Sequence, residues 1–127
     1  MQKILIADDD LTSRTVLVQA VRSEGYSTIE ASTGMRAWNI LSDNSDIVGL
    51  ITDMMMPDLS GENLIQLMRG TAQYKDTPII MVSGVVPLAD INHILELGAS
   101  RFLPKPVNLG YLREYLAALF EEGKAKK

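Results

Sequence analysis

Asp53 is the residue whose type and setting most strongly predict chemistry in this chain. It follows the apolar run 47–52 and precedes three methionines, Pro57 and, further on, Gly61. An acid at the end of a buried strand, with a proline and a glycine shaping the next loop, lies at the edge of a sheet, where open α/β folds place their ligand sites. A carboxylate in that place can serve as a nucleophile or as a ligand for a cation.

Three further polar features stand at matching places in the sequence. An acidic triplet, Asp8-Asp9-Asp10, follows the apolar run 4–7, and Ser83 ends the run that begins at residue 79. Lys105 follows a short apolar segment and stands between two prolines, which restrict the backbone around it. These groups can converge only if the apolar segments lie side by side and parallel.

Convergence of Asp8, Asp9 and Asp53 would require a positive charge among them. Two full charges about 4 Å apart repel by roughly 4 kcal/mol at an effective dielectric constant near 20. Oxygen ligands without histidine or cysteine suit a hard divalent ion, so Mg²⁺ is the natural candidate, with Mn²⁺ as a substitute. The triplet could equally be a solvated turn that caps the next helix, and for Asp10 we prefer that interpretation.

An aspartate, a metal ion, a hydroxyl and an ammonium together predict a site for a phosphoryl group. Lys105 would act as a point charge on an anion, although a lone loop lysine is usually a surface charge. Ser83, taken alone, is an ordinary serine at a strand end. Asp53 would be the nucleophile, because forming an acyl phosphate on a carboxylate needs charge neutralisation more than it needs a base.

Short β-type runs alternate with segments of helical apolar spacing along the whole chain. The runs predict strands at about residues 3–7, 27–31, 46–52, 78–83 and 101–104, and the segments between and after them predict helices at about 11–24, 35–42, 62–70, 88–97 and 109–122. Strands separated by helices of this length must be parallel with right-handed crossovers, so we expect a three-layer α/β/α sandwich. We expect one domain over residues 1–122 and a solvated tail over residues 123–127.

The composition excludes several classes of protein. The 127 residues are 46% hydrophobic, enough for one domain with its own core. A net charge of −4 argues against direct nucleic-acid binding, which needs a basic surface. The lack of cysteine excludes disulfides, thiolate metal sites and cysteine nucleophiles, and favours a cytoplasmic location. No apolar run is long enough to span a bilayer, so we expect no membrane insertion.

The motifs, taken in order, resemble the receiver (response-regulator) domains of two-component signalling, especially the single-domain chemotaxis type. The resemblance covers residues 2–121 and rests on four motifs: Asp8-Asp9, the stretch from Asp53 to Pro57 with Gly61, Ser83-Gly84, and the stretch from Phe102 to Pro106. It implies a flavodoxin-like, doubly wound (βα)5 fold whose parallel sheet has the order 2-1-3-4-5. It also implies a signalling protein that catalyses only its own phosphorylation and dephosphorylation.

For the site, the resemblance implies that Asp53 is the phosphoacceptor. Mg²⁺ would be bound by Asp9, by Asp53 and by the main-chain carbonyl of Met55, with Asp8 acting largely through water. The phosphoryl donor would be the phosphohistidine of a sensor histidine kinase or of a histidine phosphotransfer protein. The phosphorylated form would act on a downstream protein or on an output domain of a parent chain, and the chain could also form a homodimer.

The resemblance further implies a switch. Lys105 and Ser83 would contact the phosphoryl oxygens, and the peptide bond between Lys105 and Pro106 would be cis. Because a phosphoryl group adds about −1.5 to −2 charges, Ser83 would be drawn towards it and Phe102 would turn inward. The surface formed by the fourth helix, the fifth strand and the fifth helix would then change for partner binding.

Two other functions fit parts of the sequence. A haloacid-dehalogenase-type phosphatase would use Asp8 as its nucleophile, since Asp8, Asp10 and Thr12 fit its Asp-x-Asp-x-Thr signature. Against it, no acidic metal motif follows Lys105, the chain is short for that fold, and Asp53 would have no role. The other alternative is a pseudo-receiver that binds partners without phosphorylation, which the retention of every charged site residue disfavours.

Two apolar residues near the expected site bear on the lifetime of a phosphorylated form. Met55 lies two residues after Asp53, and Val85 lies two residues after Ser83. Neither side chain can orient an attacking water. We therefore expect both to slow the loss of a phosphoryl group from Asp53.

Overall fold

The described part of the chain folds into five strands that alternate with five helices, as the sequence predicts. The computed structural model describes residues 2–84 and 87–125. The strands are β1 (Lys3–Ala7), β2 (Ser27–Ala31), β3 (Ile47–Asp53), β4 (Ile79–Ser83) and β5 (Arg101–Pro104). The helices are α1 (Leu11–Ser23), α2 (Gly34–Asp43), α3 (Gly61–Arg69), α4 (Leu88–Leu97) and α5 (Leu109–Ala125). Helix α5 therefore continues three residues into the segment 123–127 for which we expected a tail.

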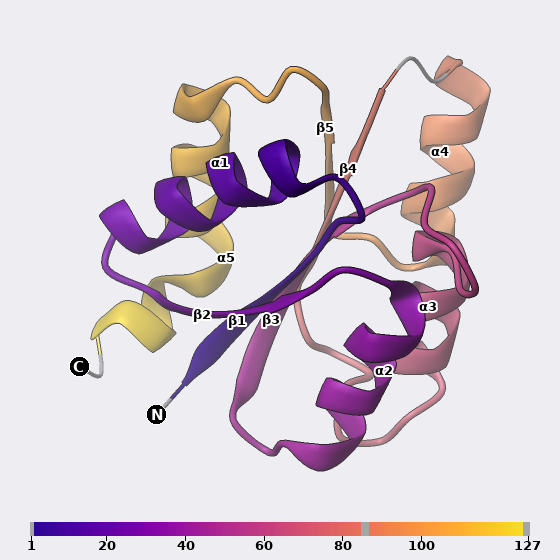
Figure 1. Ribbon diagram of the computed structural model, residues 1–127, viewed down its shortest axis with the longest axis horizontal. Coiled ribbons are helices and arrows are strands. Elements are labelled where there is room, and N and C mark those ends of the chain that lie inside the picture. Colours follow the sequence, from indigo (N-terminus) through magenta and orange to yellow (C-terminus); the bar gives the residue numbers. More distant parts are fainter. Residues whose placement is uncertain (1, 85–86, 126–127) are drawn as a thin grey trace.

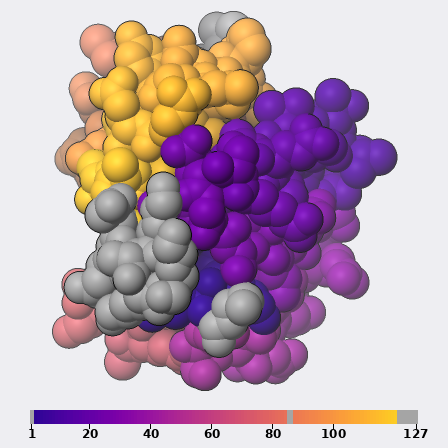
Figure 2. All heavy atoms as spheres, turned by 90° about the vertical axis from the view of Figure 1, so that its left-hand side faces the viewer, coloured from indigo at the N-terminus to yellow at the C-terminus, as the bar shows by residue number. Residues whose placement is uncertain are grey.

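All five strands are parallel, and their order in the sheet is β2-β1-β3-β4-β5. Helices α1 and α5 cover one face of the sheet, and α2, α3 and α4 cover the other (Figure 1). The turned view in Figure 2 shows α1 and α5 side by side on the first face. The expected three-layer, doubly wound fold and its strand order are confirmed.

The core lies in two layers, one on each side of the sheet, because successive side chains of a strand point to opposite faces. In β1, Ile4 and Ile6 pack towards α1 and α5, whereas Leu5 and Ala7 pack towards α2, α3 and α4. All four side chains have no exposed surface. Burial on both faces explains why the inner strands β1, β3 and β4 read as nearly continuous apolar runs rather than as an alternation of polar and apolar residues.

Side-chain caps fix where helices α1, α2, α3 and α5 begin, and for α5 the cap is Asn108, whose Oδ1 accepts a hydrogen bond from Tyr111 N at 3.0 Å. Asp10 is the N-cap of α1 and accepts a hydrogen bond from Ser13 N at 2.8 Å, which confirms the preferred interpretation of this residue. Thr33 caps α2, and Ser60 caps α3. Each cap satisfies a main-chain N–H of the first turn that would otherwise lack a partner. The helices after β1 and β3 therefore begin at defined points beside the expected site.

Within residues 2–84 and 87–125, no helix has both the length and the apolar character needed to cross a membrane.

Candidate functional site

The carboxyl ends of the parallel strands bring the predicted acids together. Asp53 is the last residue of β3, and Asp8 directly follows β1, its neighbour in the sheet. The pairing of Ala7 with Thr52 places Asp8 next to Asp53. One ligand oxygen from each of Asp8, Asp9 and Asp53 lies within 4.8 Å of the other two. Asp8 is fully buried and Asp53 is 7% exposed, whereas Asp9 is exposed.

Lys105 reaches this group of acids from the carboxyl end of β5, the edge strand that lies two positions from β3 in the sheet. Its Nζ lies 3.1 Å from Oδ2 of Asp8 and 3.5 Å from Oδ2 of Asp53. The main chain holds the lysine at the sheet, because Lys105 N donates to the carbonyl of Ser83 at 2.6 Å. The peptide bond between Lys105 and Pro106 is cis, as expected. One ammonium group thus lies between two carboxylates that come from strands β1 and β3.

The pKa values of Asp53 and Lys105 are both raised, but for different reasons. Burial is the main reason why the pKa of Asp53 is raised, and the neighbouring Asp8 raises it further, against the lowering effect of Lys105. Burial alone would lower the pKa of Lys105, but its hydrogen bond to Asp8 and its attraction to Asp53 outweigh that effect, and the pKa is raised. The ammonium is therefore charged at neutral pH.

The chemistry of the donors fits a hard divalent cation. Three carboxylates face a single ammonium, so the cluster keeps an excess of negative charge when all of these groups are ionised. The candidate ligands are all oxygen atoms, which Mg²⁺ prefers and which Mn²⁺ also accepts. Asp8, Asp9 and Asp53 are the side chains that could hold such an ion.

The loop after β3 is held close against the end of that strand. Met54 N donates to Oδ1 of Asp53 at 2.8 Å, and Gly61 N donates to the carbonyl of Met54 at 2.9 Å. A Cβ atom on Gly61 would lie only 2.4 Å from the carbonyl oxygen of Asp53, so glycine is required there. Met55, two residues after Asp53 in this loop, is 70% exposed. The sequence prediction that a glycine shapes this loop is therefore explained by a close approach of two backbones.

Ser83 and Phe102, the predicted switch residues, lie on the same half of the sheet as Lys105. Ser83 ends β4, is 5% exposed, and is paired with Pro104 of β5. Phe102 is half-buried and packs against the core on the side of α2, α3 and α4. Val85, predicted to limit water access, lies outside the described residues.

Two residues near the site were missed by sequence analysis. Arg14 of α1 donates from Nη1 to the main-chain carbonyl of Asp8 at 2.7 Å. Asp58, in the loop after β3, has a positive φ of 65° and accepts a hydrogen bond from Met35 N at 3.1 Å, so it ties this loop to the first turn of α2. Neither residue has a distinctive pattern in the sequence, because an arginine on a helix and an aspartate in a loop are common on protein surfaces.

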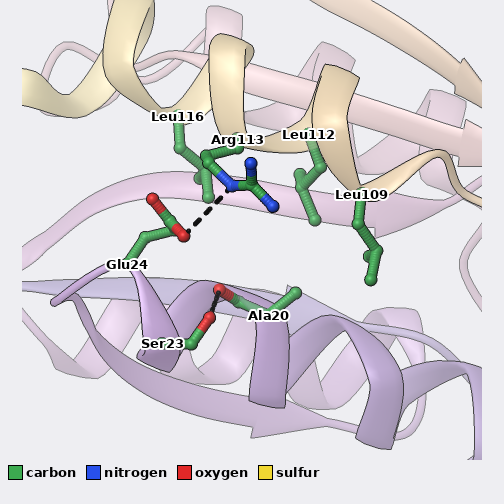
Figure 3. Close-up of a pocket in the computed structure, with 7 residues that line it drawn as sticks. All are labelled: Ala20, Ser23, Glu24, Leu109, Leu112, Arg113 and Leu116. Carbon is green, nitrogen blue, oxygen red and sulfur yellow. Dashed lines mark hydrogen bonds and ion pairs between the residues drawn. The ribbon is translucent and has the colours of Figure 1, made fainter.

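A small hollow lies away from the acids, between α1 and α5 (Figure 3). Its volume is about 60 Å³, and it is lined by Ala20, Ser23, Glu24, Leu109, Leu112, Arg113 and Leu116. An ion pair of 3.3 Å between Arg113 and Glu24 crosses it. The hollow is large enough to hold water, since a cavity needs only about 10 to 15 Å³ of such volume for one water molecule.

Comparison with known proteins gives one consistent family. The sequence model of the response regulator receiver domain matches residues 4–117. A chemotaxis protein CheY homolog of Campylobacter jejuni is 33% identical over 122 residues, which are 95% of this chain and 94% of that protein. The transcriptional regulatory protein CpxR of Escherichia coli is 38% identical over 85% of this chain but only 44% of its own length. The crystal structure of a response regulator receiver protein from Pseudomonas putida superposes with a TM-score of 0.84 at 31% identity, over 92% of this chain and 96% of that one.

Proposed function

The chain belongs to the response regulator receiver domains, and on that premise we propose that Asp53 is the residue that accepts the phosphoryl group. The family is a family of signalling domains rather than of classical enzymes, and its members accept phosphoryl groups in two-component signalling. The single observation that carries the assignment is the position of Asp53: it ends the central strand, among two other acids and the ammonium of Lys105. We propose residues 1–122 as the receiver unit.

The transfer is an in-line exchange of bonds. A carboxylate oxygen of Asp53 attacks the phosphorus of a donor phosphohistidine, so that a P–O bond forms as the P–N bond breaks and the imidazole leaves. A bound Mg²⁺, held by Asp9, Asp53 and the main-chain carbonyl of Met55, with Asp8 acting largely through water, would neutralise charge on the transferring group. Lys105 and Ser83 hold the phosphoryl oxygens by an ammonium and a hydroxyl. Hydrolysis of the acyl phosphate returns Asp53 to its starting state, and the chain needs no other catalyst for either step.

The charge added at Asp53 drives the change in the output surface. A phosphoryl group brings about −1.5 to −2 charges and three acceptor oxygens, which draw Ser83 and Lys105 inward. Phe102, half-buried on β5, then turns towards the core, and the surface of α4, β5 and α5 changes. The partners are a sensor histidine kinase or a histidine phosphotransfer protein upstream, and a protein target or a joined output domain downstream. We propose that this exchange takes place in the cytoplasm. We also propose that two copies of the chain can pair through the surface of α4, β5 and α5.

The phosphatase alternative is not favoured by these findings. Its nucleophile would be Asp8, whose carboxylate has no exposed surface, accepts a hydrogen bond from Asp10 N and pairs with Lys105. A substrate could not approach that carboxylate without displacing the lysine.

A mass measurement tests the assignment of the acceptor. The protein is incubated with acetyl phosphate and Mg²⁺, and intact-mass spectrometry is expected to show a gain of about 80 Da, the mass of a PO₃ unit that replaces a proton. Asp53→Asn should show no gain in mass. Asp8→Asn should bind Mg²⁺ more weakly but should still accept the phosphoryl group at Asp53. A wild-type protein that gains no mass would support a pseudo-receiver, and phosphate that maps to Asp8 would support the phosphatase.

A further inference from the structure

Arg14, in the first turn of α1, holds the loop that carries the acids without being one of the candidate ligands. Its Nη1 donates to the main-chain carbonyl of Asp8 at 2.7 Å, and its Nε donates to Oε1 of Glu30, in β2, at 3.1 Å. The arginine side chain is 14% exposed, while that of Glu30 is 44% exposed. A guanidinium presents several donors in one rigid plane, so a single side chain satisfies both acceptors at once.

The contact with Arg14 matters because of what lies next to it. Asp9 is exposed and, within residues 2–84 and 87–125, its carboxylate makes no hydrogen bond or ion pair, so its direction depends on the backbone. Both peptide groups beside Asp9 are held. The carbonyl before it accepts from Arg14, and the N–H after it, that of Asp10, donates to Oδ1 of Asp8 at 2.9 Å.

We propose that Arg14, itself oriented by Glu30, is a positioning residue for the divalent cation. It fixes the peptide plane that precedes Asp9, and thereby keeps the Asp9 carboxylate facing those of Asp8 and Asp53. Glu30 also neutralises the guanidinium, so that the cation site does not face an uncompensated positive charge. The proposal rests on the proposed function, because it assigns a role in the binding of the same metal ion.

The role predicts a specific pattern of defects. Groups that orient metal ligands typically change metal affinity by about 10- to 100-fold. Arg14→Ala should therefore raise the dissociation constant for Mg²⁺ by about tenfold. Because the reacting groups remain in place, the rate of phosphorylation at saturating Mg²⁺ should stay close to that of the wild type. Arg14→Lys and Glu30→Gln should have dissociation constants for Mg²⁺ between those of the wild type and Arg14→Ala. The single ammonium of the lysine variant cannot hold both acceptors in one plane.

The test uses the full chain and two readouts. Isothermal titration calorimetry with MgCl₂, in the absence of any phosphodonor, gives the dissociation constant directly. Intact-mass spectrometry after acetyl phosphate treatment gives the rate of phosphorylation as a function of Mg²⁺ concentration. Arg22→Ala is the matched control, since Arg22 also lies on α1 and reaches β2, where its Nε donates to Oγ1 of Thr28 at 2.8 Å, but it does not contact the acidic loop.

A tenfold weaker Mg²⁺ affinity in Arg14→Ala, with an unchanged plateau rate and a normal Arg22→Ala, supports the proposal. It is overturned if Arg14→Ala binds Mg²⁺ within twofold of the wild type, if Arg22→Ala weakens binding equally, or if only the plateau rate falls. Should Arg14→Ala fail to fold by circular dichroism, Arg14→Lys and Glu30→Gln decide instead: Mg²⁺ binding weakened more than about twofold with an unchanged plateau rate supports the proposal, and binding within about twofold of the wild type overturns it. Failure of the proposed function is recognisable separately, because the wild type itself would then bind no Mg²⁺ or gain no phosphate.

Discussion

Removing the ammonium of Lys105 should destabilise the metal-free protein and strengthen its binding of Mg²⁺. At an effective dielectric constant near 20, each of its two ion pairs, at 3.1 and 3.5 Å, contributes roughly 5 kcal/mol of attraction before the cost of desolvation is subtracted. Breaking a buried pair by removing one partner typically costs about 3 to 5 kcal/mol. Because the lysine side chain is 25% exposed, we expect the lower end, about 3 kcal/mol, for Lys105→Met without metal.

Mg²⁺ should recover part of that loss. In Lys105→Met, the carboxylates of Asp8 and Asp53 face each other without a positive charge, so a divalent cation relieves more repulsion than it does in the wild type. We expect the dissociation constant for Mg²⁺ to fall about tenfold, which at saturation reduces the stability deficit by about 1.4 kcal/mol.

Urea unfolding at pH 7, followed by circular dichroism, measures both effects when it is run in EDTA and again in saturating Mg²⁺. Lys3→Met is the control: its Nζ lies 3.5 Å from Oδ2 of Asp46, and both side chains are about 30% exposed. That pair lies at the opposite end of the strands, so its loss should cost no more than about 1 kcal/mol, with or without Mg²⁺. Equal stability of Lys105→Met and wild type in EDTA, or a deficit that Mg²⁺ leaves unchanged, would refute the reasoning.

Three further predictions concern Asp53 and its surroundings. Gly61→Ala should lower the free energy of unfolding in urea by about 1 to 3 kcal/mol, because the added Cβ would lie 2.4 Å from the carbonyl oxygen of Asp53. Gly84→Ala is the control and should not lower it, because a Cβ at that position would have nothing within 4 Å. Asp53→Asn should be more stable than wild type at pH 7 without metal, because the raised pKa of Asp53 means that its negative charge opposes folding. This gain in stability should vanish as the pH falls below 3.8, the ordinary pKa of an aspartate, where Asp53 is protonated in the folded and in the unfolded protein. A gain that persists below that pH would contradict this cause. Met55→Asn combined with Val85→Glu should shorten the half-life of the phosphorylated protein, measured by loss of the 80 Da adduct, and an unchanged half-life would show that water access does not limit the reaction.

Much of the fold and of the candidate site could be predicted because the deciding signals are local. Apolar runs of strand length, helical spacing and glycines near helix ends are properties of short segments, and the observed strands and helices begin and end close to the predicted positions. The parallel arrangement follows from the connections, since a helix between two strands returns the chain to the same end of the sheet. Asp8, Asp53 and Lys105 could therefore be placed at one edge before any contact was known.

The sequence by itself determined which strands and helices form and which edge of the sheet carries the acids. Only the tertiary structure decided how the burial and the pairing of neighbouring residues differ at that edge. Asp8 and Asp9 are identical in type and adjacent in the chain, yet Asp8 is fully buried against Lys105 while Asp9 is exposed. The role that we propose for Arg14, on α1, likewise depends on Glu30, which lies 16 residues away on β2. The physical reason is that burial and pairing depend on which distant segments the sheet brings together, whereas helix and strand formation depends mainly on residues a few positions apart.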